Sequence, residues 1–244
     1  MWTRSEYCNT PHPASDPLNG TDFGDKLEKA ANTKPSDGLD MRLSVAVFAD
    51  ESNAGRVYVA ISFRGESLQH EVRNGTLYAT IGSLVLVYRE DGTLATRYSD
   101  FACCDYGKQS NDAQNEIHAP PAGEVRVHLP NRYETQFSLS PGKYVIRAVI
   151  SDGTHFGIRE SPLTVEGRDP EKLSVAGVVI VRRVRRFTQN TTEGAERVAD
   201  SYRPLVSKEV EFTPTANTDF FEGDTLFSYF EICSPVVPGH QSFR

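Results

Sequence analysis

The residues best suited to chemistry lie close together in "YSDFACCDYGKQSNDAQNEIH", residues 98–118. This segment holds the adjacent cysteines Cys103 and Cys104, followed by Asp105 and His118. Thiolate and imidazole groups are the ligands that zinc prefers, and an activated thiolate can also carry redox chemistry. One interpretation of the segment is therefore a metal or redox pocket built from these four side chains.

The alternative interpretation is a structural loop held by a disulfide or by side-chain packing, and the sequence favours it. A reactive cysteine needs a lowered pKa, which a nearby cation or a helix N-terminus provides. The neighbours here are Asp100 and Asp105, whose negative charges shift the pKa of a thiol in the opposite direction. We therefore expect residues 102–118 to form an exposed loop between strands that binds no metal.

The cysteine spacing does not resemble that of a structural zinc site. The four cysteines, Cys8, Cys103, Cys104 and Cys233, form no CxxC pair. Four cysteines permit two disulfides with three connectivities, and the sequence leaves the choice open. Adjacent cysteines rarely bond to each other because bridge geometry strains the peptide between them. If Cys103 or Cys104 is oxidised, we expect a distant partner such as Cys8.

No other motif predicts catalysis. The chain lacks G-x-S-x-G, H-E-x-x-H, a P-loop and G-x-G-x-x-G. The basic cluster "VRRVRRF" at 181–187 is typical of a solvated strand end, and "EDGT" and "SDGT" are hairpin turns with too few oxygen ligands for calcium. We therefore predict no catalytic residue, no cofactor-binding residue and no metal ligand, and we expect that the protein is not an enzyme.

Composition and charge narrow the classes of partner. The net charge of -7 and the pI near 5.4 lack the basic footprint of a nucleic-acid-binding protein. No apolar run approaches the ~20 residues that a membrane-spanning helix needs. The first twenty residues contain no apolar segment of the signal-peptide kind. Either the protein is cytosolic or the chain begins inside a longer one, and we favour the second interpretation.

From Met41 onward, apolar residues recur with a period of two, which is the pattern of half-buried strands. "RVYVAISFR" places apolar residues on one face and Arg56, Ser62 and Arg64 on the other, and "EDGT" and "SDGT" each join two strands. About seven strands between Met41 and Val165 predict an immunoglobulin-like antiparallel β-sandwich. Its expected core includes Val57, Val59, Ile61, Phe63, Tyr144 and Ile146. Helix is expected chiefly at residues 22–32.

A second, incomplete β-sandwich block is predicted after the polar stretch "EGRDPEK". Its strands are "LSVAGVVIV", which we expect to be buried on both faces, "SKEVEFTP", and "DTLFSYFEICSP", which is apolar on both faces. The expected domains are an N-terminal linker with a short helix (1–40), the sandwich (41–166), a linker (167–172), the partial second domain (173–235) and a tail (236–244). Three strands bury little apolar surface. We therefore expect either self-association through the 224–233 strand or a second block that is less stable than the first sandwich.

The order of these pieces resembles the von Willebrand factor A-related (VWFA-related) proteins of Acidobacteria. "DGLDMRLSVAVF", "FSLSPGKYVIRAVISDGTHFGIRESPLTV" and "FFEGDTLFSYFEICSP" are similar to the β-rich region that follows the A domain in that family. The resemblance covers residues 36–235. It implies export to the periplasm or the exterior and an A domain elsewhere in the same protein. The Asp-x-Ser-x-Ser metal signature of that domain is not in this sequence, so no metal-binding residue is carried over.

These observations together predict a non-catalytic structural or adhesive β-sandwich region of an exported bacterial protein. Its partner would be another protein or the missing A domain, which the sandwich would position. The first alternative is a carbohydrate-binding accessory module that uses Tyr58, Tyr88 and Tyr98 as an exposed aromatic platform. The second alternative is a metal or redox protein that uses the Cys103–Cys104 segment.

Overall fold

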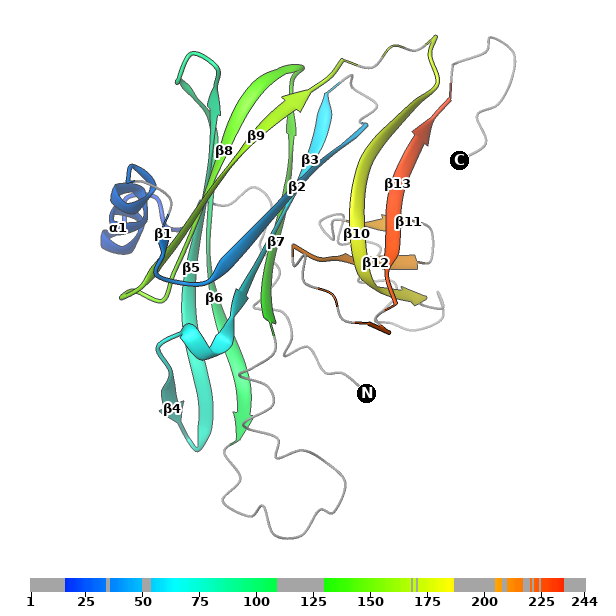
Figure 1. The fold of residues 1–244 in the computed structure, drawn as a ribbon. Coiled ribbons are helices and arrows are strands. Elements are labelled where there is room, and N and C mark those ends of the chain that lie inside the picture. Colours follow the sequence, from blue (N-terminus) through cyan, green and yellow to red (C-terminus); the bar gives the residue numbers. More distant parts are fainter. Residues whose placement is uncertain are drawn as a thin grey trace. The chain divides into compact units, whose positions relative to one another are not determined.

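The computed structural model confirms the predicted all-β class (Figure 1). It describes residues 16–33, 36–49, 54–108, 130–167, 169, 171–186, 205–207, 210–216, 220, 222–223 and 225–234 of the 244-residue chain. One α-helix, α1 (Asp22–Ala31), and one 3-10 turn, η2 (Gly65–Ser67), accompany the strands. The strands are β1 (Ser36–Asp37), β2 (Met41–Ala49), β3 (Gly55–Arg64), β4 (Glu71–Arg73), β5 (Thr76–Arg89), β6 (Leu94–Lys108), β7 (Pro130–Leu139), β8 (Gly142–Ser151), β9 (Phe156–Val165), β10 (Ser174–Arg186), β11 (Val206–Ser207), β12 (Val210–Pro214) and β13 (Phe227–Cys233).

The strands of the described residues form three sheets. One has the order β1-β9-β8-β5-β4, with β6 also paired to β5; a second has the order β2-β3-β7; the third has the order β11-β12-β10-β13. The pairs β1–β9, β4–β5, β5–β6, β10–β12, β10–β13 and β11–β12 are all antiparallel, as the sequence predicts. The alternation in "EVRVHL" predicts a further strand at residues 124–129, which lies outside the described residues.

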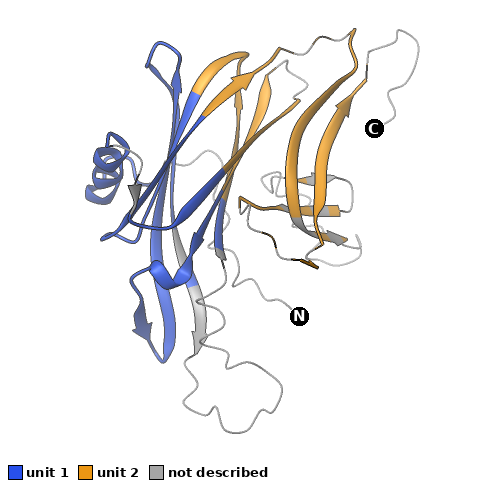
Figure 2. Cartoon of the chain, in the orientation of Figure 1, with its two compact units in different colours: residues 1–43, 61–133, 145–161 blue, residues 44–60, 134–144, 162–244 orange. Residues whose placement is uncertain are grey.

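The chain forms two compact units, and each is assembled from separate stretches of sequence (Figure 2). Unit 1 comprises residues 1–43, 61–133 and 145–161, and unit 2 comprises residues 44–60, 134–144 and 162–244. Strands β2, β3, β7, β8 and β9 contribute residues to both. The division predicted from the sequence, with boundaries near residues 40, 166 and 172, stays a prediction.

Both hairpin turns predicted from Asp-Gly pairs are confirmed. Asp91-Gly92 joins β5 to β6 and Asp152-Gly153 joins β8 to β9. Both glycines have positive φ, +82° at Gly92 and +94° at Gly153, where a Cβ would be strained. The Oδ1 atom of Asp91 accepts the Thr93 N–H at 2.8 Å, which closes the first turn. Short-range turn chemistry therefore closes these two hairpins.

The predicted helix is confirmed and belongs to the core of unit 1. Thr21 caps its first turn, because its Oγ1 accepts the N–H of Gly24 at 3.0 Å. Leu27 and Ala31 are fully buried on one side of the helix. They lie in a cluster whose other members include Leu84, Val149 and Ile158. Residues 22–31 are thus a packed element of unit 1.

Strand β3 is buried on both faces, which the sequence pattern did not predict. The six expected core residues are all buried, from Val57 to Ile146. However, Tyr58 and Ala60 on the alternate face are fully buried as well, and Ser62 keeps only 7% of its surface exposed. The reason is a second layer within unit 2: Tyr58 and Ala60 pack with Ala46 and Phe48 of β2, with Val179 and Val181 of β10, and with Leu205, Phe212 and Tyr229. We call this set the inner cluster.

Strand β10 shows the opposite error, because the sequence predicted burial on both faces. Gly177, Val179 and Val181 are buried, but Val175, Val178 and Ile180 are exposed. A run of apolar residues that no polar residue interrupts does not show whether one or both faces of the strand are covered. Only the face of β10 that joins the inner cluster is buried.

Gly177 provides a direct test of this packing. A Cβ atom there would lie 1.9 Å from Cδ1 of Phe48, and the backbone has φ of +64°. We expect Gly177→Ala to lower the free energy of unfolding by about 3 kcal/mol, as strain at positive φ and overpacking add together.

Gly92→Ala is the matched control for Gly177→Ala. Gly92 also has positive φ, but a Cβ there would meet nothing within 4 Å. Its cost should therefore be limited to backbone strain, roughly 1–2 kcal/mol. Denaturant unfolding of both variants measures the difference, and equal costs would show that the contact between Phe48 and β10 is absent.

Candidate functional site

The cysteine segment is a strand rather than the exposed loop that we predicted. Residues 98–108 continue β6 and pair with β5, with Cys104 opposite Ala79 and Cys103 opposite Thr80. Cys104 is buried at 2% exposure. The prediction of a loop is therefore wrong from residue 102 to Lys108, and the prediction of exposure is wrong at Cys104. Polar residues such as Asp100 and Asp105 suggested a loop, although they lie in a long strand that pairs with β5.

The chemistry of Cys104 is that of a structural crosslink. Cys104 forms a disulfide, whereas Cys233 is a free thiol. The partner sulfur lies outside the described residues, so the expectation that Cys8 fills this role stays a prediction. Asp105 has no described side chain, and His118 also lies outside the described part of the chain. A disulfide sulfur is not a thiolate ligand or nucleophile, so this geometry does not favour the redox or metal interpretation.

Asp152 and His155 form the most triad-like arrangement in the described residues. The carboxylate of Asp152 accepts the backbone N–H groups of Gln69 and His155 at 2.8 and 2.7 Å, and its Oδ2 lies 3.1 Å from Nδ1 of His155. Burial raises the pKa of Asp152, but the hydrogen bonds from His155, Thr154 and Gln69 outweigh it and the pKa is lowered overall. No hydroxyl or thiol of the described residues is hydrogen-bonded to His155, and Thr154 donates to Gln69 instead. The pair therefore fixes the turn between β8 and β9.

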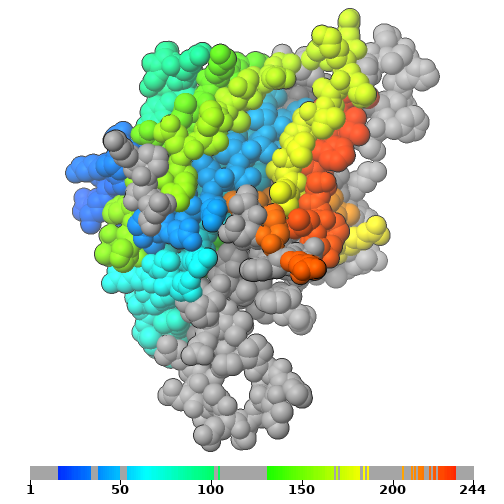
Figure 3. Space-filling view, viewed as in Figure 1, coloured from blue at the N-terminus to red at the C-terminus, as the bar shows by residue number. Residues whose placement is uncertain are grey.

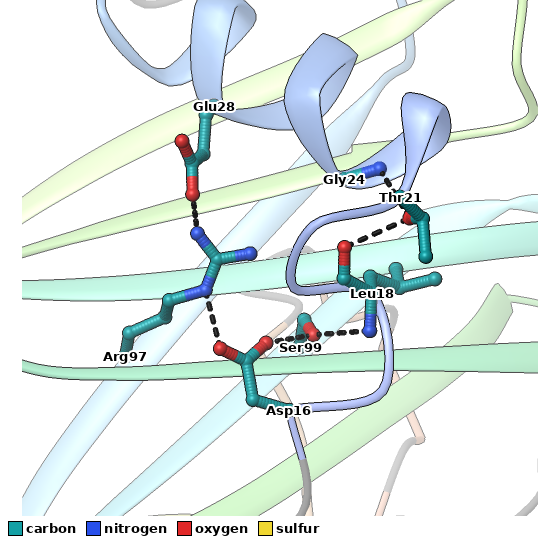
Figure 4. A network of polar contacts seen from close by, with 7 residues as sticks. All are labelled: Asp16, Leu18, Thr21, Gly24, Glu28, Arg97 and Ser99. Atoms are coloured by element: carbon teal, nitrogen blue, oxygen red, sulfur yellow. Dashed lines mark hydrogen bonds and ion pairs between the residues drawn. The ribbon is translucent and has the colours of Figure 1, made fainter.

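A second polar network joins the N-terminal segment to β6 (Figure 4). Arg97 lies between two carboxylates: its Nε is 2.5 Å from Oδ2 of Asp16, and Nη1 pairs with Glu28. Ser99 donates to Asp16 and accepts the N–H of Leu18 at 3.1 Å. Because these bonds join α1 and its entry segment to one strand, the network is an internal anchor and not a ligand site.

In the described residues, no group of three or more His, Cys, Asp or Glu side chains is arranged to hold a metal ion. The predicted tyrosine platform is also wrong at one of its three positions. Tyr58 is fully buried in the inner cluster, and Tyr88 and Tyr98 are only partly exposed. The error has the same cause as in β3: the face that carries Tyr58 is covered by the four-stranded sheet.

The inner side of β13 is fixed to β3 by a charged clamp within unit 2. The Nη2 atom of Arg56 lies 2.6 Å from Oε1 of Glu231, and the hydroxyl of Tyr229 donates to the same oxygen at 3.2 Å. The guanidinium of Arg56 also lies 5.5 Å from the ring centroid of Phe48. These contacts fix which face of β13 points inward.

The outer side of β10 and β13 is the most unusual surface of the described residues. In Figure 3 the two strands lie side by side at the surface, β10 in yellow and β13 in red. Val175 is paired with Ile232, and Gly177 and Val178 together oppose Phe230 through a bulge. We call the exposed set the outer face: Val175 (60% exposed), Val178 (67%), Ile180 (40%), Phe230 (46%) and Ile232 (64%), with Leu173 and Leu226 exposed at its ends.

The outer face was only half predicted from the sequence. The alternation in "DTLFSYFEICS" correctly placed Phe230 and Ile232 on one face and Phe227, Tyr229 and Cys233 on the other. The contribution of β10 was missed because its run reads as fully buried. The signal that could have found it is Gly177, since a glycine inside a strand often marks a bulge where alternation restarts.

Comparisons with known proteins give no family for this chain. No family model matches it, and no curated protein matches it. Among the described residues, no helix is long and apolar enough to cross a membrane. The interpretation of the outer face therefore depends on its own geometry and composition.

The clamp on β13 predicts a pH dependence of stability. Burial, together with the charge of Glu231 and the hydrogen bond to it, raises the pKa of Tyr229 from its ordinary value of 10.0 to about 12. Because the folded pKa is the higher one, the contribution to stability is complete below about pH 10 and is lost as the pH rises toward 12. Tyr229→Phe should remove this part of the alkaline loss.

Denaturant unfolding at a series of pH values, for the wild type and Tyr229→Phe, measures this effect. Other tyrosines and the lysines titrate in both proteins, so only the difference between the two curves is informative. Parallel curves between pH 10 and 12 would contradict a buried, carboxylate-bonded Tyr229.

Proposed function

We propose that this chain is a non-catalytic structural or adhesive module that contacts another protein through the outer face. The single observation that carries the proposal is the outer face itself. Its five central side chains and the flanking Leu173 and Leu226 each expose two fifths or more of their surface. Scattered exposed apolar residues are ordinary, but a contiguous patch on one sheet face is typical of an interaction site.

The size of the patch supports this interpretation. Summed over these side chains, the exposed area is on the order of 600 Å², at the upper end of the ~300–600 Å² that the largest patch of a monomer usually has. Covering it would contribute roughly 25 cal/mol for each Å² removed from water. A surface that stays exposed at this cost is expected to serve a contact.

Two further observations support an exported, protein-binding role. Cys104 forms a disulfide, and disulfides persist mainly in oxidising compartments. The resemblance of residues 36–235 to VWFA-related proteins of Acidobacteria adds a secreted or periplasmic location and a neighbouring A domain to the proposal. The immunoglobulin-like sandwich arrangement of the β domains belongs to the same proposal.

Site-specific photo-crosslinking tests this function in the cells that make the protein. A photoreactive phenylalanine analogue at Phe230 should form a discrete protein adduct, because this ring lies on the outer face. The control is the same analogue at Phe101, a ring of similar exposure (52% against 46%) that lies on β6 in unit 1. Loss of the Phe230 adduct in a Val178→Lys background would place the contact on the outer face.

The result that contradicts the proposal is equally concrete. If Phe230 gives no adduct, or gives no more than Phe101, the outer face is not a protein contact. An adduct with glycan alone would favour the carbohydrate-binding alternative.

A further inference from the structure

The composition of the outer face indicates which kind of protein fits it. The outward residues on β10 between 175 and 180, and on β13 between 228 and 232, are all apolar except Ser228, and none is charged. Transient interfaces between different proteins are about as polar as ordinary surface, whereas homodimer interfaces are more apolar and poor in charge. This face has the second composition.

We infer that the partner at the outer face is a second copy of this chain, packed with its own outer face across a two-fold axis. This inference rests on the proposed function and names its partner. An isologous contact needs a surface that is complementary to itself. An uncharged apolar face meets this condition, since two copies bring no like charges together there although the chain carries -7 overall.

The architecture of the face also suits sheet-on-sheet packing. Aligned sheets pack about 10 Å apart with interdigitating apolar side chains. Four of the five central residues here are β-branched, namely Val175, Val178, Ile180 and Ile232. The exposed area, on the order of 600 Å², approaches the ~800 Å² that each partner contributes to a standard interface. Residues around the edge of the outer face would supply the rest of the buried area in each copy.

The pairing of β13 shows why the face rather than the strand edge is assigned. In the order β11-β12-β10-β13, the strand β13 lies at one end of the sheet as the described residues define it. Joining two copies edge to edge about an axis perpendicular to the sheet would place both outer faces on the same side and leave them in water. Only face-to-face packing covers the side chains of Val178 and Ile232.

The experiment is sedimentation velocity on the full chain over a wide range of concentration, with two lysine variants. Val178→Lys should weaken the dimer at least roughly tenfold, because a buried lysine without a partner opposes association. Val72→Lys is the matched control: Val72 is a valine of similar exposure (58% against 67%) on β4 in unit 1, and its variant should dimerise as the wild type does. Ile232→Lys, on the neighbouring strand, should repeat the effect of Val178→Lys.

Crosslinks from the Phe230 analogue identify the contact itself. The expected adduct has twice the mass of the chain, and its linked peptides come from β10 or β13 of the second copy. A chain that stays monomeric, or a dimer that Val178→Lys and Ile232→Lys leave intact, overturns the inference.

The failures of the two proposals are distinguishable. A monomeric chain whose Phe230 analogue captures a different protein overturns the second-copy inference and supports the proposed function. A chain whose Phe230 analogue captures no protein overturns both. Circular dichroism of each lysine variant shows whether a loss of dimer comes from an unfolded chain. If a variant does not fold, the Phe230 crosslink in the otherwise wild-type chain still shows whether the outer face contacts a second copy.

Discussion

The four-stranded sheet depends on the close approach of Phe48 to the backbone of β10 at Gly177. This contact allows Val179, Val181 and Tyr229 to reach the far face of β2 and β3, so that Tyr58 and Ala60 are buried. Hydrophobic packing has no inherent direction, and the salt bridge between Arg56 and Glu231 adds the orientation that it lacks. The same constraint decides that the opposite side of β10 and β13 points away from the inner cluster.

The sequence predicted turns and the helix well, but it predicted poorly which sheet faces pack against each other. Turns at Asp91-Gly92 and Asp152-Gly153, and the helix at residues 22–31, follow from interactions between near neighbours in the chain, so their residues are informative. Burial of Tyr58 and exposure of Val178 depend on which sheet covers which face. That information resides in contacts between residues more than a hundred positions apart, which a pattern of period two does not contain.

The candidate site illustrates the same limit. Cys104 attracted attention because its residue type can do chemistry, yet it is a buried crosslink in a long strand. The outer face consists of apolar side chains without reactive groups. Only their solvent exposure identifies it as a surface of interest. The alternation of β13 placed Phe230 and Ile232 on one face, and these two residues are exposed on the outer face. The proposed function of this chain therefore depends on the exposed apolar area of the outer face and not on reactive side chains.

The most direct test of this account is the accessibility of valine methyl groups to a soluble paramagnetic probe, measured by NMR as the protein is concentrated. In dilute solution the methyls of Val175 and Val178 should relax as fast as those of the exposed Val72, while Val179 and Val181 stay protected. On concentration, Val175 and Val178 should become protected and Val72 should not change. Accessible Val178 methyls in the concentrated protein, or accessible Val179 methyls at any concentration, would contradict the account.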